Sequence, residues 1–156
     1  MLRPVQDSPL FRPVPVDRKV ALRAWPLVQN SHPESGQEAW MAYAASLRRK
    51  ARRKAGLIAI EDSRGYIHGV FAWHVHRAIG APRVMRVTDL VVANLPGRSL
   101  AECIVESIRE VARETDSDTV LVEIGERQIA PDALLSDGFE HLVLHCMRTL
   151  RGDAPV

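Results

Sequence analysis

The sequence has little cysteine, little excess charge and no long apolar run. Its 2 cysteines, Cys103 and Cys146, lie far apart and lack the spacing of a metal site. Both fall in segments expected to form regular structure, so we expect small buried thiols in a reducing compartment. The formal net charge of +2 is too small to argue for nucleic acid by itself.

No stretch is apolar for long enough to cross a membrane, and residues 1–11 carry charge and two prolines where a signal peptide would be apolar. With 46% hydrophobic and 26% charged residues, the composition is that of a soluble globular protein. A length of 156 residues suits one ordinary domain. We therefore expect a single soluble, cytoplasmic domain over residues 1–156, with residues 1–9 as a loose arm.

Residues 83–111 predict a strand, a tight connector and a helix. The apolar, β-branched run that ends at Val92 is typical of a buried strand, and Asn94 to Gly97 breaks it with turn residues. From Ser99 the spacing changes, and one apolar helix face is predicted at Leu100, Ile104, Ile108 and Val111. The first amides of a helix have no partners inside it, so together with Arg98 they form a candidate phosphate site.

The segments before this unit predict an edge strand, two helices and two antiparallel strands. Asp17 is expected to cap the first helix, and Pro26 to bend or end it. The second helix is expected over residues 35–54, with Gly56 ending it. The strands are expected at residues 10–16, 57–61 and 66–79, with a turn at 62–65 and a bulge or close approach at Gly69.

The segments after it predict a buried strand at residues 119–124, a short helix at 130–136 and a final antiparallel strand at 141–150. Gly138 is well placed to end the short helix.

This order of elements, with two motifs, resembles the GCN5-related N-acetyltransferase (GNAT) superfamily. The main motif of that family is Gln/Arg-x-x-Gly-x-Gly/Ala, and the matching residues here are Asn94-Leu95-Pro96-Gly97-Arg98-Ser99. Gly97 matches, whereas Asn94 and Ser99 are substitutions. The late pair Gly138-Phe139 resembles a second family signature, and the resemblance covers about residues 10–150.

The resemblance implies a mixed α+β fold with a twisted, mostly antiparallel sheet of six or seven strands and helices on both faces. The strand that ends at Val92 and the strand that starts at Thr119 would be parallel and would splay apart to admit acetyl-coenzyme A.

The same resemblance implies an N-acyltransferase that moves an acetyl group from acetyl-coenzyme A to an amine of a small molecule or protein. The implied cofactor-binding residues are Leu90, Val91, Val92, Asn94, Gly97, Arg98, Ser99 and Leu100. The first three would use their main chain, and Gly97 to Leu100 would offer amides to the pyrophosphate.

Two carboxylates are candidates for the general base. Asp89 lies near the position where the family often has an acidic residue, although it is equally interpretable as a structural carboxylate of the sheet. Glu123 lies between apolar residues, and its direction depends on the register of its strand. His74 and His76 share a strand face without further ligands at suitable spacing, so no metal is expected.

Two other functions stay open. Many family members have a tyrosine four residues before the late glycine, whereas this chain has Leu134. A GNAT-like binding or regulatory module without catalysis is therefore the second hypothesis. The third is a nucleic-acid-binding domain that uses the cations of Arg48 to Lys54, a segment that also suits another acidic partner or a solvated surface. The apolar residues of the final predicted strand suit either the core or a dimer interface, so a homodimer is a further open alternative.

Overall fold

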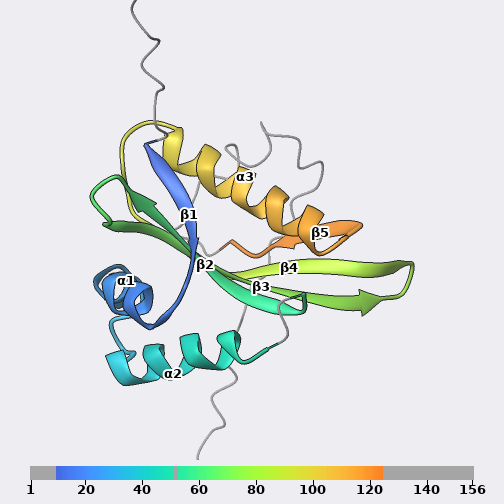
Figure 1. Ribbon diagram of the computed structural model, residues 1–156, viewed down its shortest axis with the longest axis horizontal. Helices are drawn as coiled ribbons and strands as arrows, with labels where there is room; N and C mark the ends of the chain where they lie inside the picture. The colour runs from blue at the N-terminus through green and yellow to red at the C-terminus, as the bar shows by residue number, and fades with distance from the viewer. Residues whose placement is uncertain (1–9, 51–52, 125–156) are drawn as a thin grey trace, which may run out of the picture.

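The computed structural model describes residues 10–50 and 53–124, which form one sheet between two helical layers (Figure 1). The elements are β1 (Phe11–Pro15), α1 (Arg18–Ser31), α2 (Gln37–Arg48), β2 (Ala55–Asp62), β3 (Ile67–Ala78), β4 (Ala81–Val92), α3 (Ser99–Glu114) and β5 (Thr119–Val122). The strand order is β1-β2-β3-β4-β5, and only β4 and β5 are parallel. The predicted α+β class, the mostly antiparallel sheet and the parallel pair are confirmed.

Five of the predicted strands lie in the described residues. The sixth, at residues 141–150, and the short helix at 130–136 lie outside them, as do Leu134, Gly138 and Cys146. The strand predicted as buried at residues 119–124 ends at Val122, and its residues are exposed or partly buried, so its predicted burial is wrong.

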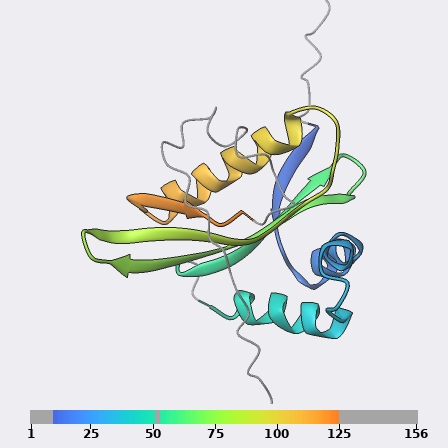
Figure 2. The ribbon, with the colours of Figure 1, turned by 180° about the vertical axis from the view of Figure 1, so that it is seen from behind.

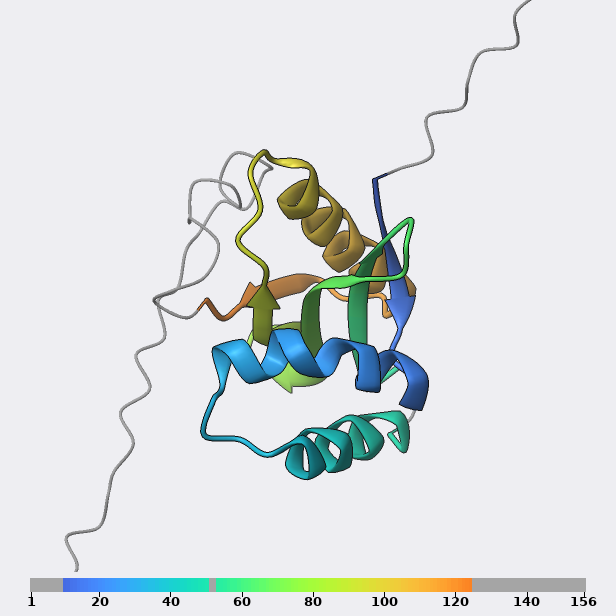
Figure 3. The same cartoon turned by 90° about the vertical axis from the view of Figure 1, so that its left-hand side faces the viewer.

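Two hydrophobic cores lie on opposite faces of the sheet. Along β3, Val70 and Ala72 point toward α1 and α2, whereas Phe71 and Trp73 point toward α3. Figure 3 shows the two helical layers on either side of the strands. The β3–β4 hairpin is longer than its neighbours and projects beyond the helices (Figure 2). The expectation of helices on both faces is confirmed.

Helix α1 begins where the sequence predicts. The Asp17 carboxylate accepts a hydrogen bond of 2.8 Å from the Val20 amide, so it caps the helix start. Val20, Ala24 and Val28, four residues apart, are buried against the sheet. Pro26 was expected either to bend the helix or to end it. The prediction that it ends the helix is wrong, because the helix continues to Ser31. Packing of the buried stripe outweighs the hydrogen bond lost at the proline.

Helix α2 is shorter than predicted. It ends at Arg48 rather than near residue 54, and Gly56 lies inside β2 opposite Trp73. Pairing with β3 satisfies the backbone from Ala55 onward, and close cations disfavour further helix. A Cβ atom at Gly56 would lie 2.7 Å from the Trp73 ring. Glycine is therefore required here by the indole that crosses the strand, not by a helix end.

Strand β1 forms an edge of the sheet, as predicted from its prolines. An edge strand tolerates Pro13 and Pro15 because its outer side needs no ladder donors. The Glu61 carboxylate on β2 joins this strand to α1: it accepts bonds from Arg12 Nε at 2.8 Å and Arg23 Nη1 at 2.9 Å. Glu61 is only 4% exposed. This ion cluster connects β1, α1 and β2.

The predicted turn at residues 62–65 is also confirmed. The Asp62 carboxylate accepts the amides of Arg64 and Tyr66, and Gly65 has a φ of +85°. The predicted irregularity near Gly69 is a register shift between Ile60 and Glu61 on the facing strand.

Candidate functional site

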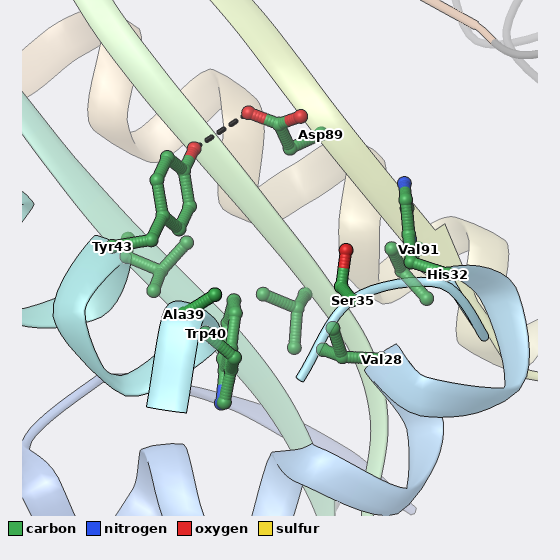
Figure 4. Close-up of a pocket in the computed structure, with 10 residues that line it drawn as sticks. Val28, His32, Ser35, Ala39, Trp40, Tyr43, Asp89 and Val91 are labelled. Atoms are coloured by element: carbon green, nitrogen blue, oxygen red, sulfur yellow. Dashed lines mark hydrogen bonds between the residues drawn. The ribbon is translucent and has the colours of Figure 1, made fainter. Parts of the chain in front are cut away.

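A bulge in β4 lies at Asp89. Ala72 on β3 faces Thr88, and Val70 faces Val91, so two residues of β4 stand against one of β3. Asp89 has a φ of +50°, a conformation that aspartate tolerates better than most residues. A bulge of this kind redirects side chains. Here the Asp89 carboxylate turns toward the face covered by α1 and α2 (Figure 4).

Tyr43 on α2 reaches this carboxylate. Its hydroxyl donates a 2.5 Å hydrogen bond to Asp89 Oδ2, drawn as a dashed line in Figure 4. Burial, and then the hydrogen bond to the carboxylate, raise the pKa of Tyr43 far above its ordinary value. Tyr43 therefore stays protonated and orients Asp89. This role was not predicted from the sequence, although a polar-tipped ring beside the buried stripe of α2 was a signal that could have indicated it.

A pocket of about 170 Å³ adjoins this pair. Its lining residues come from α1 and the loop after it, from α2, and from the sheet: Val28, His32, Ser35, Ala39, Trp40, Tyr43, Leu57, Val70, Asp89 and Val91. The Trp40 indole is fixed by a 2.8 Å hydrogen bond from Nε1 to the Ala21 carbonyl. Most of the walls are apolar, and the polar groups gather at the ends.

The other edge of β4 is open beyond the bulge. Its parallel pairing with β5 ends at Val87 and Val122, followed by one hydrogen bond of 2.9 Å from the Glu123 amide to the Val87 carbonyl. Within residues 10–50 and 53–124, no strand pairs with that edge of residues 88–92. The side chains of Leu90 and Val91 are buried, so these residues present main chain there.

The connector after β4 leads directly to the start of α3. Gly97 has a φ of +87°, and a Cβ atom there would meet nothing within 4 Å. Asn94, Arg98 and Ser99 are exposed, and the described part of the chain gives α3 no side-chain cap. The first amides of a 16-residue helix therefore face outward beside an open glycine turn. The helix itself is confirmed, with Leu100, Ile104, Ile108 and Val111 buried.

Solved structures with a similar fold include several acetyltransferases. Glucosamine-6-phosphate N-acetyltransferase from Arabidopsis thaliana matches with a TM-score of 0.72 at 12% identity, over 90% of this chain and 98% of that one. A Trypanosoma brucei acetyltransferase matches with a TM-score of 0.65 at 17% identity, over 88% and 97%. The aminoglycoside N-acetyltransferase AAC(6′)-Iy, in complex with coenzyme A, matches with a TM-score of 0.67 at 11% identity, over 95% and 99%.

This chain has the GNAT fold. The resemblance inferred from the sequence is thus confirmed at the level of fold. No protein-family model matches the chain, and no curated protein does.

Within the GNAT fold, the two candidate bases have different surroundings. Glu123 follows β5 and ion-pairs with Arg86 of β4. It does not line the pocket next to Asp89, so the structure does not bring the two carboxylates together there. Asp89 has hydroxyl partners, Tyr43 at 2.5 Å and Thr88 at 3.3 Å.

The histidines of β3 lie on the face predicted for them. His74 is partly buried and His76 is exposed, whereas Trp73 and Val75 pack in the opposite core. Burial and then the charge of Lys50 lower the pKa of His74, so it is neutral near pH 7. No three His, Cys, Asp or Glu residues of the described chain are grouped so that they could hold a metal ion. Burial raises the pKa of the Cys103 thiol, which disfavours a nucleophilic role.

The basic segment is exposed wherever the structure describes it. Arg48, Arg49, Lys50, Arg53 and Lys54 all lie at the surface. Arg53 approaches Asp116 at 3.9 Å, and both side chains are more than 70% exposed. This geometry is that of a solvated surface. None of the helices in the described ranges is long and apolar enough to cross a membrane.

Proposed function

We propose that this protein is an acetyl-coenzyme A-dependent N-acetyltransferase that acts on an amine. One observation carries the proposal: the edge of β4 at residues 88–92, to which no strand of the described residues pairs, continues through the Gly97 turn into the start of α3, where the described residues provide no side-chain cap. An unpaired strand edge suits the amide groups of an extended arm, and helix-start amides suit phosphate. The chain therefore offers both kinds of contact in one continuous stretch.

The residues would divide the binding between them. The main chain of Leu90, Val91 and Val92 would hold the pantetheine arm. The amides from Gly97 to Leu100 would bind the pyrophosphate, with Asn94 and Arg98 at the mouth of the turn. Acetyl-coenzyme A, when bound, would supply the acetyl group as an activated thioester.

Asp89 is the proposed base, positioned by Tyr43. An amine reacts only after losing its extra proton, and a nearby carboxylate can accept that proton directly or through water. The new bond joins the amine nitrogen to the acetyl carbon, while the carbon–sulfur bond breaks. One ammonium ion and one thioester are consumed, and one amide, one thiol and one proton are formed. The ion pair of Glu123 with Arg86 supports Asp89 over Glu123 for this role.

Thermal unfolding with acetyl-coenzyme A, coenzyme A and ATP tests the binding step. At about one hundred times its dissociation constant, a ligand stabilises the fold by roughly 2.7 kcal/mol. For a chain of this length we expect Tm to rise by about 5–10 °C with both coenzyme A forms and to stay unchanged with ATP. An unchanged Tm with all three ligands would reject the proposal. Binding without transfer to any amine would favour the binding or regulatory module, to which the substitutions at Asn94 and Ser99 also point.

Gly97→Val tests the phosphate-binding turn. A β-branched residue resists positive φ, so the turn should change shape and weaken coenzyme A binding by more than tenfold. The control is Gly80→Val, because Gly80 also has a positive φ, +78°, and a Cβ atom there would also meet nothing within 4 Å. Both variants should lose about 1–3 kcal/mol of folding stability. In calorimetry, only Gly97→Val should lose coenzyme A binding. Equal affinity for coenzyme A in the two variants would contradict the assignment of the Gly97 turn to phosphate binding.

A further inference from the structure

The pocket beside Asp89 has the size and walls of a site for a small apolar body. Its sides are formed by Val28, Leu57, Val70 and Val91, with the fixed indole of Trp40. Its volume is about 170 Å³. An engineered apolar cavity of about 150 Å³ accepts benzene, so this pocket has room for one six-membered ring or a branched chain of that size.

The two ends of the pocket differ in chemistry. Figure 4 shows Tyr43 and Asp89 together at one end, and His32 and Ser35 at the other. Asp89 Oδ2 is held by Tyr43, and no described residue donates to its second oxygen, Oδ1. A carboxylate in this position attracts an ammonium group.

His32 at the opposite end has an unmet hydrogen-bonding atom. Its Nδ1 is buried and has no partner in residues 10–50 and 53–124. The imidazole itself lines this end of the pocket, so a hydroxyl group of a ligand can pair with the ring there. The described lining includes neither lysine nor arginine, so nothing there complements a phosphate.

We propose that the acceptor is a small primary amine with an apolar body of about one ring, bound with its nitrogen at Asp89 and a hydrogen-bonding group at His32. This inference rests on the proposed function, and it specifies the acceptor that the function leaves open. It predicts that the pocket selects against sugar phosphates and against long polyamines, which would place charge on apolar walls.

A panel of amines tests the class directly. Tyramine and 2-phenylethylamine differ only in the hydroxyl group, and spermidine and glucosamine 6-phosphate represent the excluded classes. We expect kcat/KM to rank tyramine above 2-phenylethylamine, and both at least tenfold above spermidine and glucosamine 6-phosphate. A preference for spermidine or glucosamine 6-phosphate would overturn the proposal.

His32→Phe tests the far end of the pocket. One hydrogen bond corresponds to roughly a two- to tenfold preference. In the wild type we expect tyramine to exceed 2-phenylethylamine by about that factor, and in His32→Phe the two should become equal through loss of the tyramine rate alone. An unchanged ratio would show that His32 does not meet the acceptor.

Ala39→Trp tests the body of the pocket. Ala39 lines it and is exposed, so a large side chain can fill the space without entering the core. The matched control is Ala42→Trp, on the same helix, exposed and outside this pocket. Ala39→Trp should raise KM for tyramine more than tenfold, whereas Ala42→Trp should leave it unchanged. Equal effects would contradict the pocket assignment.

Binding without coenzyme A separates this inference from the proposed function. The Trp40 indole N–H is a single buried reporter in the pocket wall, and NMR can follow it as tyramine is added. A shift that Ala39→Trp abolishes supports the pocket, even if no coenzyme A form raises Tm and the acetyltransferase proposal fails. No shift, in a protein that does bind coenzyme A, overturns the inference alone.

Discussion

Two carboxylates show how surroundings decide what a residue does. Glu61 is 4% exposed and accepts hydrogen bonds from two guanidinium groups, so its role is structural. Asp89 is exposed on a bulge and held by hydroxyl groups, so it keeps an oxygen for another molecule. The same functional group is thus a structural ion at one position and a candidate base at the other.

Glu61→Gln should lower the free energy of unfolding by about 1–2 kcal/mol at pH 7, measured by urea titration. The substitution removes two charge-assisted hydrogen bonds, but Arg12 and Arg23 are partly exposed and become hydrated. Glu110→Gln is the control, since its ion pair with Arg113 lies on the exposed side of α3. It should change the value by less than about 0.5 kcal/mol. Equal losses in the two variants would argue against a special role for Glu61.

The Glu61 contribution should also depend on pH. Burial alone would raise the pKa of Glu61, but the hydrogen bonds from Arg23 and Arg12 outweigh burial and hold it below its ordinary value of 4.5. The folded state therefore binds fewer protons than the unfolded state near that pH. Its contribution is complete above pH 4.5 and is lost as the pH falls through the folded pKa. The stability difference between wild type and Glu61→Gln should shrink at pH 3; a constant difference contradicts this linkage.

At the scale of elements, a local signal sets the start of α1, and strand pairing limits the end of α2. Asp17 begins α1 as its position predicts, because a cap depends only on residues three positions apart. The end of α2 depends instead on β2, which pairs with β3 from Ala55. The first boundary was therefore predictable from the sequence, and the second was not.

Asp17→Ala should destabilise the protein by about 1 kcal/mol, because the Val20 amide loses its acceptor. Chemical denaturation monitored by circular dichroism measures the loss. Asp17→Asn keeps an acceptor oxygen and should remain within a few tenths of a kcal/mol of wild type. If alanine and asparagine behave alike, the carboxylate does not cap the helix.

At the scale of the whole molecule, the proposed binding surfaces lie at β4 and the start of α3, whereas the basic segment lies at the end of α2 (Figure 1). Its cations are exposed and make few contacts in the described part of the chain. We therefore interpret the described cations of this segment, at residues 48–50 and 53–54, as a solvated surface.

Replacing Arg48, Arg49 and Arg53 together with glutamine should change the free energy of unfolding by less than about 1 kcal/mol, because exposed charges contribute little. Coenzyme A binding should be unchanged. Titration of the wild type with single-stranded DNA at several salt concentrations gives the opposing test. A steeply salt-dependent complex that the triple variant loses would favour the nucleic-acid hypothesis.

The parts of the fold and site that could be predicted are those that depend on residues close together in the sequence. The helix from Leu100 to Val111, the turn at Gly65 and the strand that begins at Thr119 were all located from their neighbouring residues, whereas the parallel pairing of that strand came from the family resemblance. The roles of Tyr43 and His32 were not predicted, since the partner of Tyr43 and the pocket that His32 lines are formed by elements distant in the chain. The role of Glu123 was also beyond reach, because its ion pair with Arg86 depends on register.

By itself, the sequence determined the order of the described strands and helices along the chain, because hydrophobic period and turn chemistry act over a few residues. The α+β class came from the resemblance that this order carries. Only the tertiary structure decided that Tyr43 meets Asp89 across 46 positions, that the β4 bulge turns Asp89 toward α2, and that a pocket forms beside it. Those outcomes depend on how α1, α2 and the sheet pack together. Packing is a property of surfaces distant in the chain, and no local pattern encodes it.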